Sequence, residues 1–555
     1  MMSAKPKSTA HASLGKGPNL TWPSRPAMAA LLGGTLLLLI APPNHNAFWA
    51  VNGLRSIDSR VELAVLAAAL ASGVLAWRPP RGRLAVSIAL PALALTLAIP
   101  LGEVLHHLGD TFSRWGAIAE WVHATGPQPF LERARQLHAQ PVDAALWLLV
   151  VGAVTPSDVS PAAGIGFVSA LLGVVYLAGA WRIARILDAG RGLAWGLWLA
   201  MIMNGGLLAF ASYAESAPVM LATSVWFWAA LLVPLDSVPR ATATVGTWVL
   251  AALAHRTGLA LLVPLALRLV GPGQVGDVPG LRRATAVAAA VAAIGVTVVN
   301  ARFGAGQLGS DLRELLQGPA QGAWASLPSD VPNLLILIAP LALLAPALAG
   351  GGLRRVAADA RSLPLVLAGL LYLPLMFPLP VAGSGLGYHR DWDLALPLGL
   401  ALTLLSARAL AELPAARLRG AQVATVPLLV LIAGGWLAVN RDPAASLARV
   451  EALVNSAPRI GPMQRSSALL YLGDYSLAMG RPAEAARRLE ESWLLVASPA
   501  RGLHTVLAWV QAGEPDSAER VLRVLRADAG LPPHAVADAD SLEAAIQRLR
   551  PMPGP

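Results

Sequence analysis

Long runs of apolar residues, separated by short polar stretches, make up most of the first 440 positions of the chain. A helix needs about 20 apolar residues to cross the roughly 30 Å hydrocarbon layer of a bilayer, and most of the runs approach that length. Gly, Pro and Arg interrupt the runs, whereas a β-barrel would alternate apolar and polar residues. The chain is therefore predicted to be an all-α polytopic membrane protein with about 11–13 transmembrane helices. The runs cover approximately residues 27–41, 61–77, 84–101, 163–181, 192–211, 217–235, 241–254, 258–270, 284–300, 331–349, 363–382, 394–411 and 421–439.

Arginine residues predict the sidedness of the loops, because short cytoplasmic loops carry an excess of Lys and Arg. We place the polar tail 1–26 in the cytoplasm and treat 27–41 as a retained span rather than a signal peptide. The short runs 241–254 and 258–270 are counted as a hairpin, with one long kinked span as the alternative. The inside loops then hold Arg78, Arg81, Arg83, Arg182, Arg185, Arg191, Arg240, Arg282, Arg283, Arg354, Arg355, Arg361, Arg408, Arg417 and Arg419. The extracytoplasmic segments are then 101–162, 212–216, 301–330 and 383–393.

The pattern changes after Arg441, because residues 441–555 are charged and amphipathic and contain no run long enough to span a bilayer. Two Gly-x-Pro stretches, at 480–485 and 513–518, lie about 33 residues apart, close to the period of tetratricopeptide hairpins. The large, small and turn residues of such a repeat fall at Leu469, Gly473, Ala485, Leu489 and Pro499. We expect a transmembrane domain over 27–440 and a small extracytoplasmic helical repeat domain over 441–555, with a generic helical hairpin tail as the alternative.

Composition narrows the class further. At 555 residues, with 55% hydrophobic and 13% charged residues, the chain is too apolar for a soluble globule. The net charge of +10 does not indicate a nucleic-acid partner, because the Arg residues are spread among short loops between apolar runs. The absence of Cys excludes disulfides and thiol chemistry.

Ionisable residues gather in four groups at the predicted outer face, where they are costly next to lipid and are therefore functional candidates. The first is the segment 101–120, with Asp110 and Arg114, and the second is Tyr213-Ala214-Glu215-Ser216. The third is His255-Arg256-Thr257-Gly258, between the two short apolar runs. The fourth is Tyr388-His389-Arg390-Asp391-Trp392-Asp393, directly before a span.

Each group also has a structural interpretation. Ser216 before Ala217-Pro218 is a good helix N-cap, and Glu215 favours the positive end of a helix dipole. Asp391 and Asp393 are suited to cap the span that follows, with Trp392 as an interfacial anchor. His255 and Arg256 fit an ordinary loop, and Asp110 fits a hydrated loop carboxylate.

The order of these groups resembles the membrane-embedded glycosyltransferases of the GT-C class, which take sugars from polyprenyl-phosphate carriers. That class includes protein O-mannosyltransferases, aminoarabinose transferases, oligosaccharyltransferases and bacterial members with tetratricopeptide tails. Gly109-Asp110 fits the acidic residue of their first outer loop, and Gln140-Pro141 fits the element that leads into a juxtamembrane helix, here Ala144–Val154. Tyr213, Glu215 and Pro218 fit the start of a later helix. The resemblance covers roughly residues 84–400.

The resemblance implies a sugar transfer and a role for each matching residue. Asp110 is the expected catalytic base for the acceptor hydroxyl. Arg256 and Arg390, together with His255 or His389, are expected to bind the phosphate, and Arg114 is an equal candidate. Glu215 is expected to contact sugar or acceptor, and Asp391 and Asp393 complete the substrate-binding set. Many members carry a second acid after the first, whereas Thr111 follows Asp110, so no metal ligand is assigned and a divalent cation stays open.

The implied enzyme is an inverting glycosyltransferase of the plasma (inner) membrane, with its active site and C-terminus extracytoplasmic. Its expected partners are a polyprenyl-phosphate-linked sugar, membrane lipids, a glycan, lipid or protein acceptor and a protein bound by the repeat domain. The alternatives are a transporter or flippase for a lipid-linked sugar, an O-antigen ligase or polymerase, and a non-catalytic assembly protein. A transporter would show inverted repeats, a ligase a large basic late outer loop, and an assembly protein would not need so many spans.

Overall fold

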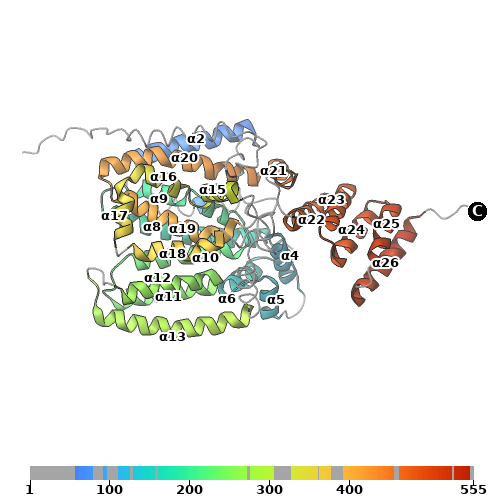
Figure 1. The fold of residues 1–555 in the computed structure, drawn as a ribbon, viewed down its shortest axis with the longest axis horizontal. Coiled ribbons are helices and arrows are strands. Elements are labelled where there is room, and N and C mark those ends of the chain that lie inside the picture. The colour runs from blue at the N-terminus through green and yellow to red at the C-terminus, as the bar shows by residue number, and fades with distance from the viewer. Residues whose placement is uncertain are drawn as a thin grey trace, which may run out of the picture.

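Figure 1 shows a bundle of long helices that lie side by side, with a smaller group of helices beyond one end. In this computed structural model every regular element among the described residues is a helix, so the predicted all-α class is confirmed. The described residues are 50, 57–78, 92–94, 96, 111–124, 129–156, 160–271, 276–304, 327–359, 362–376, 392–455, 462–527 and 531–550.

Five helices of the described chain are long and apolar enough to cross a membrane, or up to seven if each of two bent pairs counts as one span. The five cover Ser59–Trp77, Ala162–Asp188, Pro279–Phe303, Trp392–Ala411 and Ala415–Arg441, and the bent pairs cover Phe130–Val154 and Asp330–Ala349. Two shorter apolar helices, Ser216–Leu231 and Leu363–Leu373, accompany them. The chain is a polytopic membrane protein. The predicted span 27–41 lies outside the described residues, as does most of 84–101.

The helices of the bundle pack along one another. Helix α10 packs between α8 and α11, α2 lies along α20, and α19 packs against α16 and α18. The elements are α2 (Ser59–Trp77), α8 (Ala162–Asp188), α9 (Ala194–Ile202), η4 (Gly205–Phe210), α10 (Ser216–Leu231), α11 (Val238–Ala254), η5 (Arg256–Leu261), α12 (Leu262–Val270), α13 (Pro279–Gly304), α15 (Leu327–Ile338), α16 (Pro340–Ala349), α17 (Gly351–Ala358), α18 (Leu363–Met376), η8 (Trp392–Ala395), α19 (Leu396–Ala411) and α20 (Ala415–Arg441).

Some predicted spans are interrupted by turns that the apolar pattern does not reveal. The run 192–211 is not one helix, because Asn204 ends α9 and its side chain accepts a hydrogen bond from Gly206 N at 2.8 Å, starting the 3₁₀ turn η4. The run 331–349 bends by 83° between α15 and α16. The short runs form two separate helices, α11 and α12, joined by the 3₁₀ turn η5, which packs on α11.

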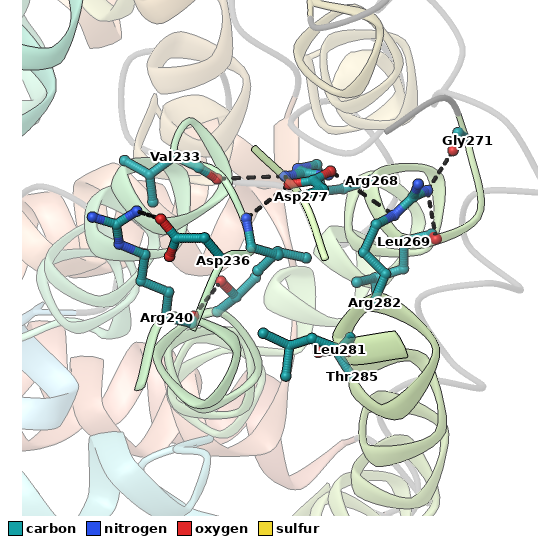
Figure 2. A network of polar contacts seen from close by, with 12 residues as sticks. Val233, Asp236, Arg240, Arg268, Leu269, Gly271, Asp277, Leu281, Arg282 and Thr285 are labelled. Atoms are coloured by element: carbon teal, nitrogen blue, oxygen red, sulfur yellow. Dashed lines mark hydrogen bonds and ion pairs between the residues drawn. The ribbon is translucent and has the colours of Figure 1, made fainter. Parts of the chain in front are cut away.

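The connections α8–α9, α10–α11, α12–α13 and α19–α20 form what we call the inner end, which the positive-inside pattern predicts to face the cytoplasm. Arg191 ties two of them together, donating to the carbonyl oxygens of Ala411 at 2.8 Å and Leu413 at 3.2 Å. Figure 2 shows a second tie, in which Asp277 of the α12–α13 connection accepts from Leu235 N at 2.8 Å and pairs with Arg268 of α12.

The opposite end of the bundle, which we call the outer end, carries short elements that do not run along its length. They are α4 (Thr111–Val122), α5 (Phe130–Gln136), α6 (Pro141–Ala144), the π-helical turn η3 (Ala145–Val150) and α7 (Val151–Val154). The helix formed by α6, η3 and α7 bends by 107° away from α5. It covers the predicted juxtamembrane helix and lies at the same end as the start of α10 and the α11–η5 turn (Figure 1).

The C-terminal helices stack one after another beyond the outer end (Figure 1). They are α21 (Pro443–Asn455), α22 (Pro462–Ala478), α23 (Pro482–Leu495), α24 (Pro499–Gln511), α25 (Pro515–Arg526) and α26 (Pro533–Leu549). Gly480 and Gly513 adopt φ values of +68° and +72° in the turns that the Gly-x-Pro pattern predicts. A Cβ atom at Gly473 would lie 2.6 Å from Leu489 Cγ, so a small residue is needed where α22 and α23 meet. The tetratricopeptide-like nature of this domain stays a prediction.

Candidate functional site

A buried ion-pair network joins three segments at the outer end. Arg114 of α4 donates from Nη2 to Asp143 Oδ2 at 2.8 Å and from Nη1 to Glu215 Oε2 at 3.1 Å. The Arg114 side chain is 4% exposed and that of Asp143 is fully buried. The network therefore fixes α4, α6 and the start of α10 relative to one another, although the three residues are far apart in sequence.

Local structure explains how the two carboxylates reach Arg114. Pro141 starts α6 at its first turn, and the π turn that follows places Trp147 so that its Nε1 donates to the carbonyl oxygen of Glu215 at 3.0 Å. Glu215 itself occupies the N-cap position of α10, in place of the predicted Ser216, and makes no side-chain cap. Its carboxylate is directed to Arg114 instead.

Electrostatics favour a permanent charge on Arg114. Burial disfavours the guanidinium charge, but Asp143 and Glu215 outweigh this effect and raise the pKa of Arg114 above its usual range. Two carboxylates already accept from Arg114, so its capacity to bind a phosphate is largely used. The network positions the surrounding elements. Arg256 and Arg390 remain the candidate cations for phosphate binding.

A polar cavity of about 80 Å³ opens beside this network. It is lined by residues from α4, the α5–α6 connection, the start of α10, the α11–η5 turn and η8, and these segments are far apart in the sequence. The lining residues are Arg114, Leu137, His138, Gln140, Glu215, Ser216, His255, Arg256, Asp393 and Leu394. Five residues that the sequence singles out therefore lie around one cavity: Arg114, Glu215, His255, Arg256 and Asp393.

His255 is held in one orientation at the α11–η5 turn. Its Nδ1 accepts from the backbone N–H of Thr257 at 3.2 Å and lies 2.7 Å from the Thr257 hydroxyl. Tyr372 of α18 donates from its hydroxyl to the carbonyl oxygen of Thr257 at 3.1 Å. Burial, assisted by Arg256 and Arg114, lowers the pKa of His255 to about 3. This shift favours the neutral imidazole of His255, which binds a phosphate through a hydrogen bond rather than through a charge.

Close packing keeps this turn tight. A Cβ atom at Gly258 would lie 2.2 Å from the carbonyl oxygen of Ala251, so α11 and η5 approach each other more closely than any other residue allows. Trp392, predicted as an interfacial anchor, is instead fully buried, with its ring 5.9 Å from that of Tyr213. This contact places η8, and with it Asp393, beside the start of α10.

The remaining predicted residues, Asp110, His389, Arg390 and Asp391, lie outside the described residues. Asp110 directly precedes α4 in the sequence, and the other three precede η8. The sequence pattern did not assign Asp143, Gln140 or His138 to the site, although it singled out Gln140-Pro141 as the start of a helix. In the sequence Asp143 is a single carboxylate before an apolar run. Such a carboxylate is equally typical of an ordinary helix N-terminus, so the pattern did not indicate a functional role. His138 has a φ of +51°, unusual for a residue other than glycine, which no sequence pattern announces.

Within the described parts of the chain, no group of three His, Cys, Asp or Glu residues is placed to hold a metal ion. Arg114 occupies the position between Asp143 and Glu215 that a cation would need.

Comparisons with known proteins add the following. No protein-family model matches the chain, and no curated protein matches it. The chain is similar to the crystal structure of ArnT from Cupriavidus metallidurans bound to undecaprenyl phosphate, with 15% identity and a TM-score of 0.41 over 82% of this chain and 84% of that chain. It is also similar to the apo state of ArnT from Cupriavidus metallidurans, with 14% identity and a TM-score of 0.33 over 83% and 76%.

Proposed function

We propose that the protein is a membrane glycosyltransferase that moves a sugar from a polyprenyl-phosphate carrier to an extracytoplasmic acceptor. The observation that carries the proposal is the outer-end cavity, which combines a guanidinium, carboxylates and uncharged polar groups at one end of an apolar bundle. Each type of group has a task in this reaction. A lipid-linked substrate places its polar head at the same level, where the apolar helices end.

Phosphate binding is assigned to Arg256, with Arg390 as a second cation. Arg256 lines the cavity from the α11–η5 turn, whose geometry is fixed by Gly258, Thr257 and Tyr372. A guanidinium at a fixed position stabilises the charge that develops on the leaving phosphate. His255, being neutral, contributes a hydrogen bond rather than a charge.

Asp110 is assigned as the general base. It directly precedes α4, which carries Arg114 and is fixed by the Arg114 ion pairs. In the reaction Asp110 accepts the proton of the acceptor hydroxyl while that oxygen forms a bond to the anomeric carbon. The bond between the anomeric carbon and the phosphate oxygen breaks, and the polyprenyl phosphate leaves with the bonding electrons. Attack from the face opposite the phosphate inverts the anomeric configuration.

The carboxylates have different tasks in this scheme. Glu215 shares Arg114 with Asp143 and forms part of the cavity wall, whereas Asp393 reaches the wall from η8. Both are placed to accept hydrogen bonds from hydroxyl groups of a sugar or acceptor. Asp391 and His389 belong to the segment before η8 and are assigned to the same binding surface. The acceptor is a glycan, a lipid or a protein.

The proposed sidedness follows from the positive-inside pattern. Arg191 lies in the α8–α9 connection, and the Arg268–Asp277 pair joins the end of α12 to the α12–α13 connection, all at the inner end. The cavity and the C-terminal helices then face the extracytoplasmic side of the plasma (inner) membrane. The C-terminal domain is proposed to bind a partner protein or the acceptor there.

Transfer by the purified full-length protein in liposomes tests this function. Radiolabelled polyprenyl-phosphate sugars are supplied with membrane extract as the acceptor source, and wild type is compared with Asp110→Asn. The proposal predicts that wild type moves label from the lipid to an acceptor and that Asp110→Asn does not. Equal transfer by both proteins would refute Asp110 as the base. Label that crosses the bilayer without leaving its lipid would identify a transporter instead.

A further inference from the structure

Gln140 is a buried polar residue whose side-chain oxygen makes no hydrogen bond to a described residue. It lies between α5 and α6, is 5% exposed and lines the outer-end cavity. Its Oε1 has no hydrogen-bond partner among the described residues. Burying an unpaired amide group costs free energy, so its place in a cavity wall calls for a partner within the cavity.

His255 presents the complementary group. Because a backbone N–H can only donate, the contact with Thr257 N requires Nδ1 to be an acceptor. The single ring proton of the neutral imidazole then lies on Nε2, and none of the residues that the structure describes accepts it. The burial that keeps the ring neutral also keeps this donor uncharged.

The charged residues of the cavity wall differ from these two groups. Arg114 and Glu215 pair with each other, and Asp143 completes that network. Gln140 Oε1 and His255 Nε2 are thus uncharged groups of cavity-lining residues, and neither bonds a described residue. A hydroxyl group both donates and accepts, which matches an amide next to an imidazole donor.

We infer that Gln140 and His255 bind hydroxyl groups of the sugar, with Gln140 contributing its carboxamide and His255 contributing its Nε2–H donor. The inference rests on the proposed function and adds to it the two residues that distinguish the sugar from the lipid phosphate. The cation Arg256 binds the phosphate, and these uncharged groups bind the sugar.

Three substitutions separate this role from structural roles. Gln140→Met keeps the length of the side chain and removes no hydrogen bond to a described residue, so packing alone predicts no loss of stability. His255→Asn keeps an acceptor near the position of Nδ1 and can still cap η5, but it lacks the Nε2 donor. His255→Gln places an amide donor near the position of Nε2 and lacks the cap. Matched controls are Gln511→Met and His534→Asn, at exposed positions of the C-terminal helices.

The test measures binding by the full-length protein in nanodiscs. The probes are polyprenyl phosphate and its glucose, mannose and arabinose conjugates, and the readout is the ratio of Kd for polyprenyl phosphate to Kd for the tightest conjugate. We expect Gln140→Met and His255→Asn each to lower this ratio about three- to tenfold, the value of one uncharged hydrogen bond. Kd for polyprenyl phosphate itself should not change. His255→Gln should keep the ratio but lower the melting temperature, and the two controls should match wild type.

The outcomes separate the two proposals. Unchanged ratios in both Gln140→Met and His255→Asn would overturn the inference, since Gln140 would then meet only water and His255 would only cap a helix. Wild type that binds polyprenyl phosphate but no conjugate more tightly would also overturn it. Wild type that binds none of the probes would instead contradict the proposed function.

Discussion

Two buried arginine–carboxylate networks lie at opposite ends of the bundle, and they differ in stoichiometry and surroundings. At the outer end one guanidinium, Arg114, serves two carboxylates beside a cavity. At the inner end one carboxylate, Asp277, serves Arg268 at 2.6 and 2.7 Å, with Arg282 at 3.9 Å (Figure 2).

Their remaining contacts show what each network does. At the inner end other donors reach main-chain oxygens: Arg268 donates to Val233 O at 3.4 Å, and Arg282 to Leu269 O at 2.9 Å and to Gly271 O, while the Nε atoms of both arginines have no hydrogen-bond partner among the described residues. Side chains and main chain thus both contribute to the inner network, which ties two connections together. At the outer end the excess charge is negative and uncharged polar groups line a space. The same type of ion pair therefore links two connections at the inner end and lines a candidate site at the outer end.

Removal of the central cation of the outer network should have the largest effect. Arg114→Met leaves Asp143 and Glu215 buried without a counter-charge, and we expect a loss of about 3–5 kcal/mol of unfolding free energy together with the loss of transfer. Thermal denaturation in detergent measures the first. The triple variant with Asp143→Asn and Glu215→Gln should recover most of the stability, because no buried charge is left. A melting temperature of Arg114→Met equal to wild type would contradict the ion-pair role.

Removal of the central carboxylate of the inner network should destabilise less. Asp277→Asn leaves Arg268 and Arg282 with their carbonyl partners, so we expect a loss of about 2–3 kcal/mol, below the full cost of an unpaired buried charge. The rate of sugar transfer per folded molecule should equal that of wild type. A large decrease in that rate, with melting unchanged, would show that the inner end also takes part in the reaction.

The pH dependence of stability should distinguish the two ends. The folded pKa of His255 is about 3, below the unfolded value of about 6.5, so the unfolded chain binds the proton first. The stabilisation from neutral His255 is therefore full above about pH 6.5 and falls by about 2 kcal/mol between pH 6.5 and pH 5. We expect this decrease in wild type and in Asp277→Asn, but not in His255→Asn. Parallel melting curves of wild type and His255→Asn over this range would refute the neutral, buried state of His255.

The smallest effect on stability is expected for the exposed ion pair near the inner network. Arg240 pairs with Asp236 at 2.5 Å, but the two side chains are 44% and 40% exposed. Arg240→Gln should change the unfolding free energy by less than about 0.5 kcal/mol, because water screens the pair. A loss as large as that of Asp277→Asn in the same melting experiment would mean that burial is not what separates these pairs.

The sequence predicted the helices well where an apolar run continues to both ends. Helices α8, α10, α13, α19 and α20 begin and end within several residues of their predicted runs. The break after Ile202 was missed because Asn204, Gly205 and Gly206 form a short turn within an apolar run. The bend before Pro340 was missed because the residues on both sides of it are apolar.

The candidate site could be predicted only in part. Ionisable residues clustered at the ends of apolar runs, and this pattern singled out five residues that line the outer-end cavity in the structure. They are Arg114, Glu215, His255, Arg256 and Asp393. The pairing of Arg114 with Asp143 and Glu215 spans 29 and 101 positions, and such tertiary contacts leave no local pattern. The neutrality of His255 also depends on burial by distant elements. The sequence therefore indicated which residue types form the candidate site. The fold determines which of these residues pair with one another and which of them are charged.

Sugar transfer by a matched pair of arginine variants tests the central claim most directly. Arg256 lines the outer-end cavity, whereas Arg240 lies at the inner end. Label transferred from radiolabelled polyprenyl-phosphate sugars in liposomes is measured for Arg256→Gln and Arg240→Gln, per folded molecule. The account predicts a decrease of about a hundredfold for Arg256→Gln and the wild-type rate for Arg240→Gln. Wild-type transfer by Arg256→Gln would contradict the claim that the outer-end cavity is the site of the reaction.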